Sequence, residues 1–219
     1  GKPVDPGKYE LSDGFSQGVG AVVKIPGLDS LEAVQANNLV PINHLGEYAK
    51  PNQKVVVINA KTGKRHPIWA EIDSNAGSDR NRVLQIKPSE NYEEKTRYII
   101  ALRNLTDENG KRIEAPNAFR YYRDNINGGQ GRVNKRRTHF EGIFKTLRKA
   151  GIKRGDLYLA WDFTTASNEN NYKRTLSMRD RAFDMLGDSI LKDRVVDGDA
   201  PEFQIDEVEL DPSDPLIAR

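Results

Sequence analysis

The chain has 219 residues, with 34 Lys and Arg against 32 Asp and Glu, a formal net charge of +2 and a mean hydropathy of −0.72. The near balance of charge excludes a whole-molecule field that would attract nucleic acid or acidic lipid. The absence of cysteine excludes disulfides, thiolate metal sites and a cysteine nucleophile. No apolar run in the sequence approaches the roughly 20 residues of a membrane-spanning helix.

The first half of the chain predicts β-structure. After an irregular arm over residues 1–18, short β-branched and aromatic runs alternate with turns rich in Pro, Gly, Asn and Asp, which is typical of an all-β domain. A short helical turn is expected near residues 31–36. The predicted strands cover residues 19–25, 55–58, 67–72, 83–88 and 98–102. We expect the last two to be neighbours in one sheet, and residues 98–102 to be buried on both faces, because apolar side chains occupy both.

The pattern changes after residue 117. Residues 117–131 end in a Gly-rich run and predict a flexible break. Residues 134–150 predict an amphipathic helix with Asn134 as the N-cap and Gly151 as the C-terminal stop. The apolar stripe of this helix is Phe140, Ile143, Phe144 and Leu147.

The last part of the chain predicts a strand, a helix and a further strand. Residues 157–165 alternate between apolar and other side chains, a period typical of a strand, and residues 168–186 carry an apolar stripe at helical spacing. Residues 203–210 predict a last strand. The stripe of the helix is Tyr172, Leu176, Phe183 and Leu186.

Together these elements predict a mainly β fold, an Ig-like β-sandwich over residues 1–210, with helices inserted near 134–150 and 168–186. A mixed α+β domain is the alternative. Residues 211–219 are interpreted as a linker to a missing downstream domain. Because the chain begins with Gly1 and stops at Arg219 without a terminal helix, we expect it to be a piece of a longer protein from which any signal peptide has been removed.

Residues 14–18 match the G-x-S-x-G pattern of a nucleophile elbow, in which a Ser lies on a strained turn between a buried strand and a helix. No buried strand is predicted before Ser16, and a strand rather than a helix is predicted after it. We therefore expect Ser16 to lie in a turn of the N-terminal arm. The alternative is a small serine esterase in which Ser16 is activated by His44 or His139.

The remaining polar residues indicate no metal or cofactor. His44, His66 and His139 lack a second His at ligand spacing, so a zinc or iron site is not favoured, and His139 is expected at the edge of the apolar stripe. Three loops hold oxygen ligands that suit calcium, but none fits an EF-hand, and tight turns select the same residues. These loops are residues 73–79, 107–110 and 193–199. Calcium stays an open alternative.

Charge is distributed unevenly, with a basic segment at residues 132–154 and an acidic one at residues 197–214. Glu141 interrupts the basic segment and no aromatic platform accompanies it, which favours a solvated helix face over a phosphate-binding surface. We therefore predict no nucleic acid partner. Trp69 and Trp161 lie in predicted strands, where core packing is favoured over sugar binding; an exposed ring would reverse this interpretation.

Four motifs together carry a family resemblance. They are residues 13–16 (the DGFS motif), residues 84–88 with 96–102, the turn at residues 105–110, and residues 161–167 (the WDFTTAS motif). They resemble the Ig-like N-terminal region found ahead of the catalytic domain in large secreted bacterial lipase-like α/β-hydrolases. Residues 83–113 also resemble the bacterial Ig-like domains of S-layer and cell-surface proteins.

The resemblance implies a non-catalytic accessory module of a secreted or cell-surface protein, whose partner is a downstream catalytic domain of the same chain. It implies no catalytic residue here, because no position matches the family's catalytic motif. We also predict no cofactor-binding and no metal-binding residue. In that family the DGFS motif belongs to the accessory region. A cell-surface adhesion or glycan-binding module is a further alternative.

Overall fold

The computed structural model describes residues 3, 6–8, 10–128, 131–188, 190, 192–195, 197–198 and 202–206. It divides the chain into two compact units, Gly1–Asn171 and Tyr172–Arg219. The predicted linker at residues 211–219 and positions 207–210 of the last predicted strand lie outside the described residues. Residues 203–206, the described part of that predicted strand, are not in a strand.

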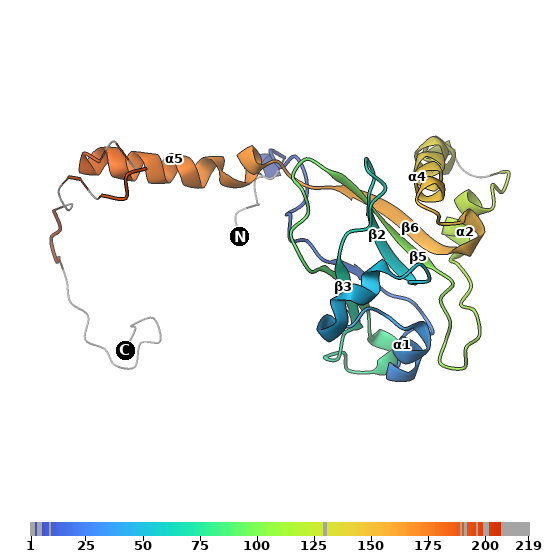
Figure 1. Ribbon diagram of the computed structural model, residues 1–219. Helices are drawn as coiled ribbons and strands as arrows, with labels where there is room; N and C mark the ends of the chain where they lie inside the picture. The colour runs from blue at the N-terminus through green and yellow to red at the C-terminus, as the bar shows by residue number, and fades with distance from the viewer. Residues whose placement is uncertain are drawn as a thin grey trace. The chain divides into compact units, whose positions relative to one another are not determined.

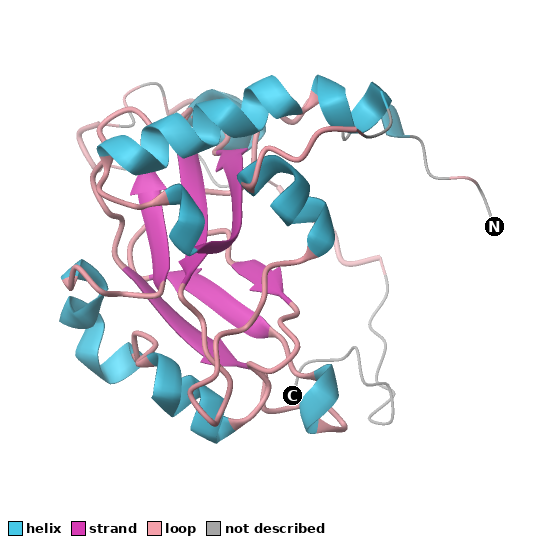
Figure 2. Ribbon diagram, turned by 90° about the vertical axis from the view of Figure 1, so that its right-hand side faces the viewer, coloured by secondary structure: helices cyan, strands magenta, loops and turns pink. Residues whose placement is uncertain are grey.

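The first unit contains two three-stranded antiparallel sheets, with strand orders β1-β4-β3 and β2-β5-β6 (Figure 1, Figure 2). The strands are β1 Ala21–Val23, β2 Val55–Asn59, β3 Ile68–Ile72, β4 Leu84–Pro88, β5 Arg97–Arg103 and β6 Leu157–Thr164. Each coincides with a run of β-branched and aromatic residues from which a strand was predicted. The expected burial of residues 98–102 on both faces is confirmed, since β5 is buried at every position after Arg97.

The prediction that β4 and β5 are neighbours is wrong. β4 pairs with β1 and β3, whereas β5 pairs with β2 and β6. The connection over residues 89–96 is too long for a tight hairpin turn, and it carries the chain from one sheet to the other. Tyr92, in the middle of this connection, is only 2% exposed and packs into the core.

Among the described residues, five α-helices accompany the sheets: α1 Leu31–Asn37, α2 Asn117–Arg123, α3 Gly131–Lys135, α4 Arg137–Lys149 and α5 Asn168–Leu186. The predicted break at residues 117–131 is wrong in its first half, because α2 buries Phe119 and Tyr122 against α4. The ring centroids of Tyr122 and Phe140 lie 4.0 Å apart. Asn134 is not the N-cap of α4 but lies inside α3. The 3₁₀ segments in the part of the chain that the structure describes are η1 Pro6–Lys8, η2 Ile42–Ala49, η3 Asp79–Asn81 and η4 Arg154–Asp156.

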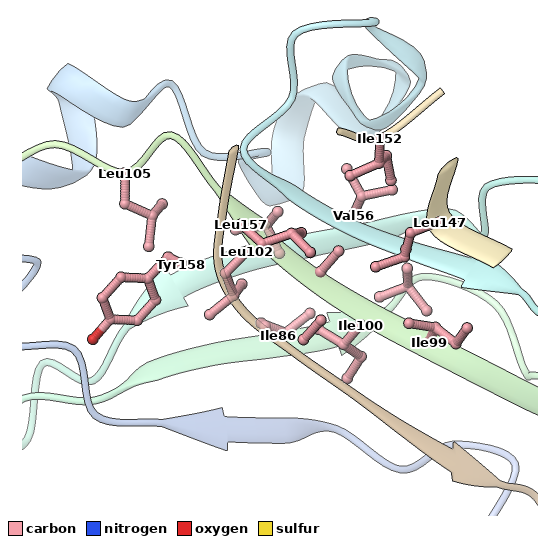
Figure 3. Close-up of a cluster of buried hydrophobic side chains, with 14 of the residues drawn as sticks. Val56, Ile86, Ile99, Ile100, Leu102, Leu105, Leu147, Ile152, Leu157 and Tyr158 are labelled. Carbon is pink, nitrogen blue, oxygen red and sulfur yellow. The ribbon is translucent and has the colours of Figure 1, made fainter. Parts of the chain in front are cut away.

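The fold is therefore α+β, and the mainly β Ig-like sandwich expected from the sequence is corrected. Helices occupy more of the described chain than strands do. One core joins the elements: Figure 3 shows Ile86 of β4, Ile99, Ile100 and Leu102 of β5 and Leu147 of α4 in one cluster of buried side chains. α2 and α4 pack on the β2-β5-β6 sheet and belong to the long connection between β5 and β6 (Figure 1).

Gly151 ends α4 as predicted. Its φ of 79° lies in the left-handed region that favours glycine. The N–H of Gly151 donates to the carbonyl of Arg148 (3.0 Å) and the N–H of Ile152 to that of Leu147 (2.9 Å), the two bonds of a Schellman motif. Ile152 and Leu147 are both buried, which adds the apolar contact that accompanies this motif.

Two glycine substitutions, one within α4 and one just after its end, are expected to change stability in opposite directions. Gly151→Ala should lower the free energy of unfolding by about 1 kcal/mol because of its positive φ. Gly142→Ala should raise it by up to about 1 kcal/mol, because Gly142 is helical and has no atom within 4 Å of the added Cβ. Urea denaturation measures both, and a destabilised Gly142→Ala would contradict the helix geometry.

α5 begins in the first unit at Asn168 and ends in the second at Leu186. Its span agrees with the predicted helix, but none of its residues is buried, including the predicted stripe. Tyr172 is 48% exposed and Met185 is 84% exposed. No helix in the described part of the chain is long and apolar enough to cross a membrane.

Candidate functional site

The DGFS and WDFTTAS motifs, about 150 positions apart in sequence, pack against each other. The N–H of Phe15 donates to the carbonyl of Thr164 (2.9 Å), and the N–H of Ala166 donates to the carbonyl of Phe15 (2.7 Å). Phe15 thereby forms a short parallel bridge at Thr165, just after the end of β6. We call residues 13–16 with residues 164–167 the motif junction.

Glycine at position 14 is required by close contact of the two segments. A Cβ on Gly14 would lie 2.5 Å from both the backbone N of Ala166 and the carbonyl carbon of Thr165. Real Cβ atoms do not approach a backbone so closely, so any other residue would push the segments apart. The motif junction therefore explains why glycine precedes Phe15.

Asp13 and Ser167 join the motif junction to the start of α5. The Asp13 Oδ1 accepts a hydrogen bond from the N–H of Ser167 (3.0 Å), and hydrogen bonds from the Ser167 hydroxyl and backbone lower the pKa of Asp13. The Ser167 Oγ in turn accepts from the N–H of Asn170 (2.9 Å), the bond of an N-cap serine. Asn170 also donates through Nδ2 to the carbonyl of Leu11 (2.7 Å).

Thr165 connects the motif junction to the segment between β4 and β5. Its hydroxyl donates to the carbonyl of Glu93 (2.5 Å) and accepts from the N–H of Thr96 (3.0 Å). Thr165 is only 1% exposed, so its hydroxyl is satisfied by these backbone groups and not by bulk water.

An aromatic cluster lies behind the motif junction. Phe163 contacts Phe15 edge-on at a centroid distance of 6.3 Å, and it contacts Tyr92 at 5.2 Å and Tyr98 at 5.8 Å. Such contacts contribute about 0.5–1.5 kcal/mol each beyond the area they bury. His66 lies against Tyr92 at 4.3 Å, and one ring nitrogen is 3.0 Å from the carbonyl oxygen of Glu90. His66 is thus a core residue of this cluster.

The stability of the protein is expected to fall in mild acid because of His66. Burial lowers the pKa of His66 from its ordinary value of 6.5. A lowered pKa means that the folded state resists protonation, so the stability contribution is complete above 6.5 and is lost as the pH falls below it. The free energy of unfolding is measured at about pH 7.5 and at about pH 5. The loss between the two pH values should be smaller for His66→Phe than for the wild type. His44→Gln, at an exposed histidine, is the control.

Ser16 lies in an exposed turn of the N-terminal arm, and the element that follows is the strand β1. Its Oγ accepts a hydrogen bond from the N–H of Gly18 (3.3 Å), and among the described residues no imidazole is bonded to it. The three histidines lie at other places: His44 in η2, His66 against Glu90, and His139 against Asp162. Ser16 therefore does not lie between a strand and a helix, as the serine of a nucleophile elbow does.

Asp162 of β6 contacts two basic groups, Arg97 on β5 and His139 on α4. Its Oδ2 is 2.7 Å from Nε of Arg97, and its Oδ1 is 2.7 Å from Nε2 of His139. Burial raises the pKa of Asp162, but the hydrogen bonds from Arg97 and His139 outweigh burial and lower it overall. His139 lies next to Phe140 at the edge of the apolar stripe, as predicted. This cluster was not predicted from the sequence, although the alternation of β6 already placed Asp162 on the face opposite Trp161.

A mainly apolar hollow of about 230 Å³ lies beside the motif junction. It is lined by residues of β1, β5 and β6 and by the arm that precedes β1. The lining residues are Phe15, Val19, Gly20, Ala21, Val22, Ile100, Trp161, Asp162 and Phe163. Trp161 is half-buried in this wall, whereas the half-buried Trp69 is covered by Lys87, whose Nζ lies 4.5 Å from the ring centroid.

The acidic loops weighed for calcium use their carboxylates in local turns. One aspartate in each loop accepts from a backbone N–H two residues later: Asp73 from Asn75 (2.9 Å), Asp107 from Asn109 (3.0 Å) and Asp193 from Val195 (2.9 Å). These are Asx turns. Within the described residues, no group of three or more His, Asp or Glu side chains could hold a metal ion.

Part of the basic segment is engaged within the protein. Arg137 donates to Asn125 and lies over the ring of Tyr121, and Arg154 pairs with Glu141 at 2.8 Å. Other cations of α4 are exposed, and two of them occupy its last turn, where the helix dipole favours positive charge. These exposed cations are Lys145, Arg148 and Lys149.

Comparison with family models, with curated proteins and with solved structures found no match for this chain.

Proposed function

We propose that this chain is a non-catalytic accessory module of an exported bacterial protein, and that it supports a lipase- or esterase-like hydrolase domain of the same protein. The resemblance of the DGFS and WDFTTAS motifs suggests this role. In this proposal the body with two sheets is the counterpart of the Ig-like region, and α2, α3 and α4 are an insertion between β5 and β6.

One observation carries the proposal: the residues of the two motifs are partners of one another. Phe15 bonds the backbone at Thr164 and Ala166, and Asp13 bonds Ser167. These residues therefore connect two segments of the fold, and this role involves no chemical reaction. Ser16, the remaining residue of the DGFS motif, bonds its own turn at Gly18, and nucleophilic activation would require a base within hydrogen-bond reach of its Oγ.

Ester hydrolysis by the isolated chain tests the non-catalytic role. Wild type and Ser16→Ala are assayed with short-chain nitrophenyl esters, and both are expected to show the same background rate. Ser16→Ala should also retain its stability to within about 0.5 kcal/mol, because the side chain is exposed. Turnover that depends on Ser16 would overturn the proposal.

The supporting role is tested on the full-length protein. The coding sequence beyond Arg219 is expected to contain a nucleophile-elbow motif between a predicted strand and a predicted helix. Removing residues 1–219 should then lower the temperature at which the hydrolase domain unfolds and loses its activity. The proposal is rejected if no hydrolase domain follows, or if that domain is equally stable and active without the module.

A further inference from the structure

The hollow beside the motif junction lies between edge strands of the two sheets. β1 has β4 as its partner and β6 has β5, and among the described residues no strand pairs with the other edge of either, apart from the bridge at Phe15. Side chains of Trp161 and Phe163 share one face of β6, because alternate residues of a strand point the same way. The Asp162 side chain points to the opposite face, where it meets Arg97 and His139. Asp162 therefore lines the hollow with its backbone.

The backbone at this edge of β6 can form further hydrogen bonds. The carbonyl of Thr164 and the N–H of Ala166 face away from β5 and bond Phe15. By the same alternation, the N–H and carbonyl of Asp162 and Ala160 also face away from β5. Within the described residues no strand pairs with them there. A polar donor and acceptor thus lie at the rim of an apolar hollow.

The size and lining of the hollow define what fits. A cavity of about 150 Å³ lined by apolar side chains holds a benzene molecule, so about 230 Å³ accommodates one aromatic ring or a short aliphatic chain. It is smaller than the roughly 300–1,000 Å³ pockets that take drug-sized ligands. Three aromatic rings form its walls, and Phe15 keeps 57% of its surface exposed. A ligand would cover this apolar surface, which favours binding.

From this geometry we propose that the hollow is a binding site for a small apolar group, an acyl chain or a single aromatic ring, whose polar end bonds the backbone of Asp162. A sugar is disfavoured, because its hydroxyls need several polar side chains and those that line the hollow are apolar. This proposal is independent of the accessory role, since a binding site can exist with or without a hydrolase partner.

Tryptophan fluorescence tests the site. The chain has two tryptophans, so Trp69→Phe leaves Trp161, in the wall of the hollow, as the single reporter. In this background the chain is titrated with octanoate, with benzyl alcohol and with glucose. We expect a saturable change with affinity of about 1 mM for octanoate, benzyl alcohol or both, because ligands of this size offer few contact atoms. Saturation by octanoate would identify an acyl chain as the ligand group, and saturation by benzyl alcohol would identify an aromatic ring.

Two variants locate the binding. Ala21→Leu fills the hollow, and Val22→Asp places a charge at its rim, on a residue that is 66% exposed. Each should weaken binding at least about tenfold. Ala118→Leu, the same substitution as the first but at an exposed position of α2, should bind as the parent does. Saturation by glucose alone, saturation by none of the three probes, or unchanged binding in Val22→Asp would overturn the proposal.

Discussion

Replacing Gly14 by Ala is expected to lower the free energy of unfolding by about 2–3 kcal/mol, the cost of forcing extra atoms into a packed site. The added Cβ would lie 2.5 Å from the backbone of Thr165 and Ala166, and neither neighbour is a flexible side chain that could move aside. The bridge of Phe15 to the end of β6 would open. Urea denaturation at equilibrium measures the change as a lower midpoint with an unchanged slope.

Gly18→Ala is the matched control for Gly14→Ala. Both glycines belong to the G-x-S-x-G pattern, but a Cβ on Gly18 meets its nearest atom, Oδ1 of Asn91, at 3.6 Å, which is ordinary contact. Its stability should change by less than about 0.5 kcal/mol. If both variants were equally stable, close contact at the motif junction would be disproved.

Thr165→Val is expected to cost about 2 kcal/mol. The substitution keeps the shape of the side chain but removes the hydroxyl that bonds the backbone at Glu93 and Thr96. Two backbone groups then lose their partner beside a residue that is 1% exposed, and an unsatisfied group of this kind costs about 1–3 kcal/mol. Thermal and urea denaturation measure the loss.

Thr164→Val is the control, at the neighbouring position of the same motif. The Thr164 side chain is exposed and β-branched residues suit a strand, so this variant should be as stable as the wild type. Equal losses at the two positions would show that threonine at 165 has no special role in the motif junction.

Local structure was largely predictable from the sequence, whereas strand pairing was not. The runs that became β1 to β6 satisfy strand periodicity, and Gly151 follows the last apolar residue of α4, so both signals are local. Whether β4 and β5 pair depends on the course of residues 89–96. Because Tyr92 of this connection is buried in the core, the connection crosses from one sheet to the other and the two strands do not pair. α2 was missed because its seven residues bury only Phe119 and Tyr122, a stripe too short to distinguish from a loop.

The candidate site was predictable only in part, for the same reason. The turn at Ser16 followed from its flanking residues, and the edge position of His139 followed from the helical stripe. The motif junction joins segments about 150 positions apart, and the periodicity of apolar residues within one segment does not predict contacts over such a separation. One usable signal was present: two motifs rich in Asp, Gly, Ser and Thr, at opposite ends of the first unit, each contain side chains that cap or bridge a backbone.

Amide hydrogen exchange of Phe15 and Ala166 tests the motif junction most directly. Both N–H groups donate across it, at 2.9 and 2.7 Å. They should therefore exchange only when the N-terminal arm separates from β6, with protection close to that of the β5 and β6 amides. The N–H of Gly18, bonded at 3.3 Å to an exposed Ser16, should exchange much faster. Exchange of Phe15 and Ala166 at the rate of an unstructured peptide would contradict the account.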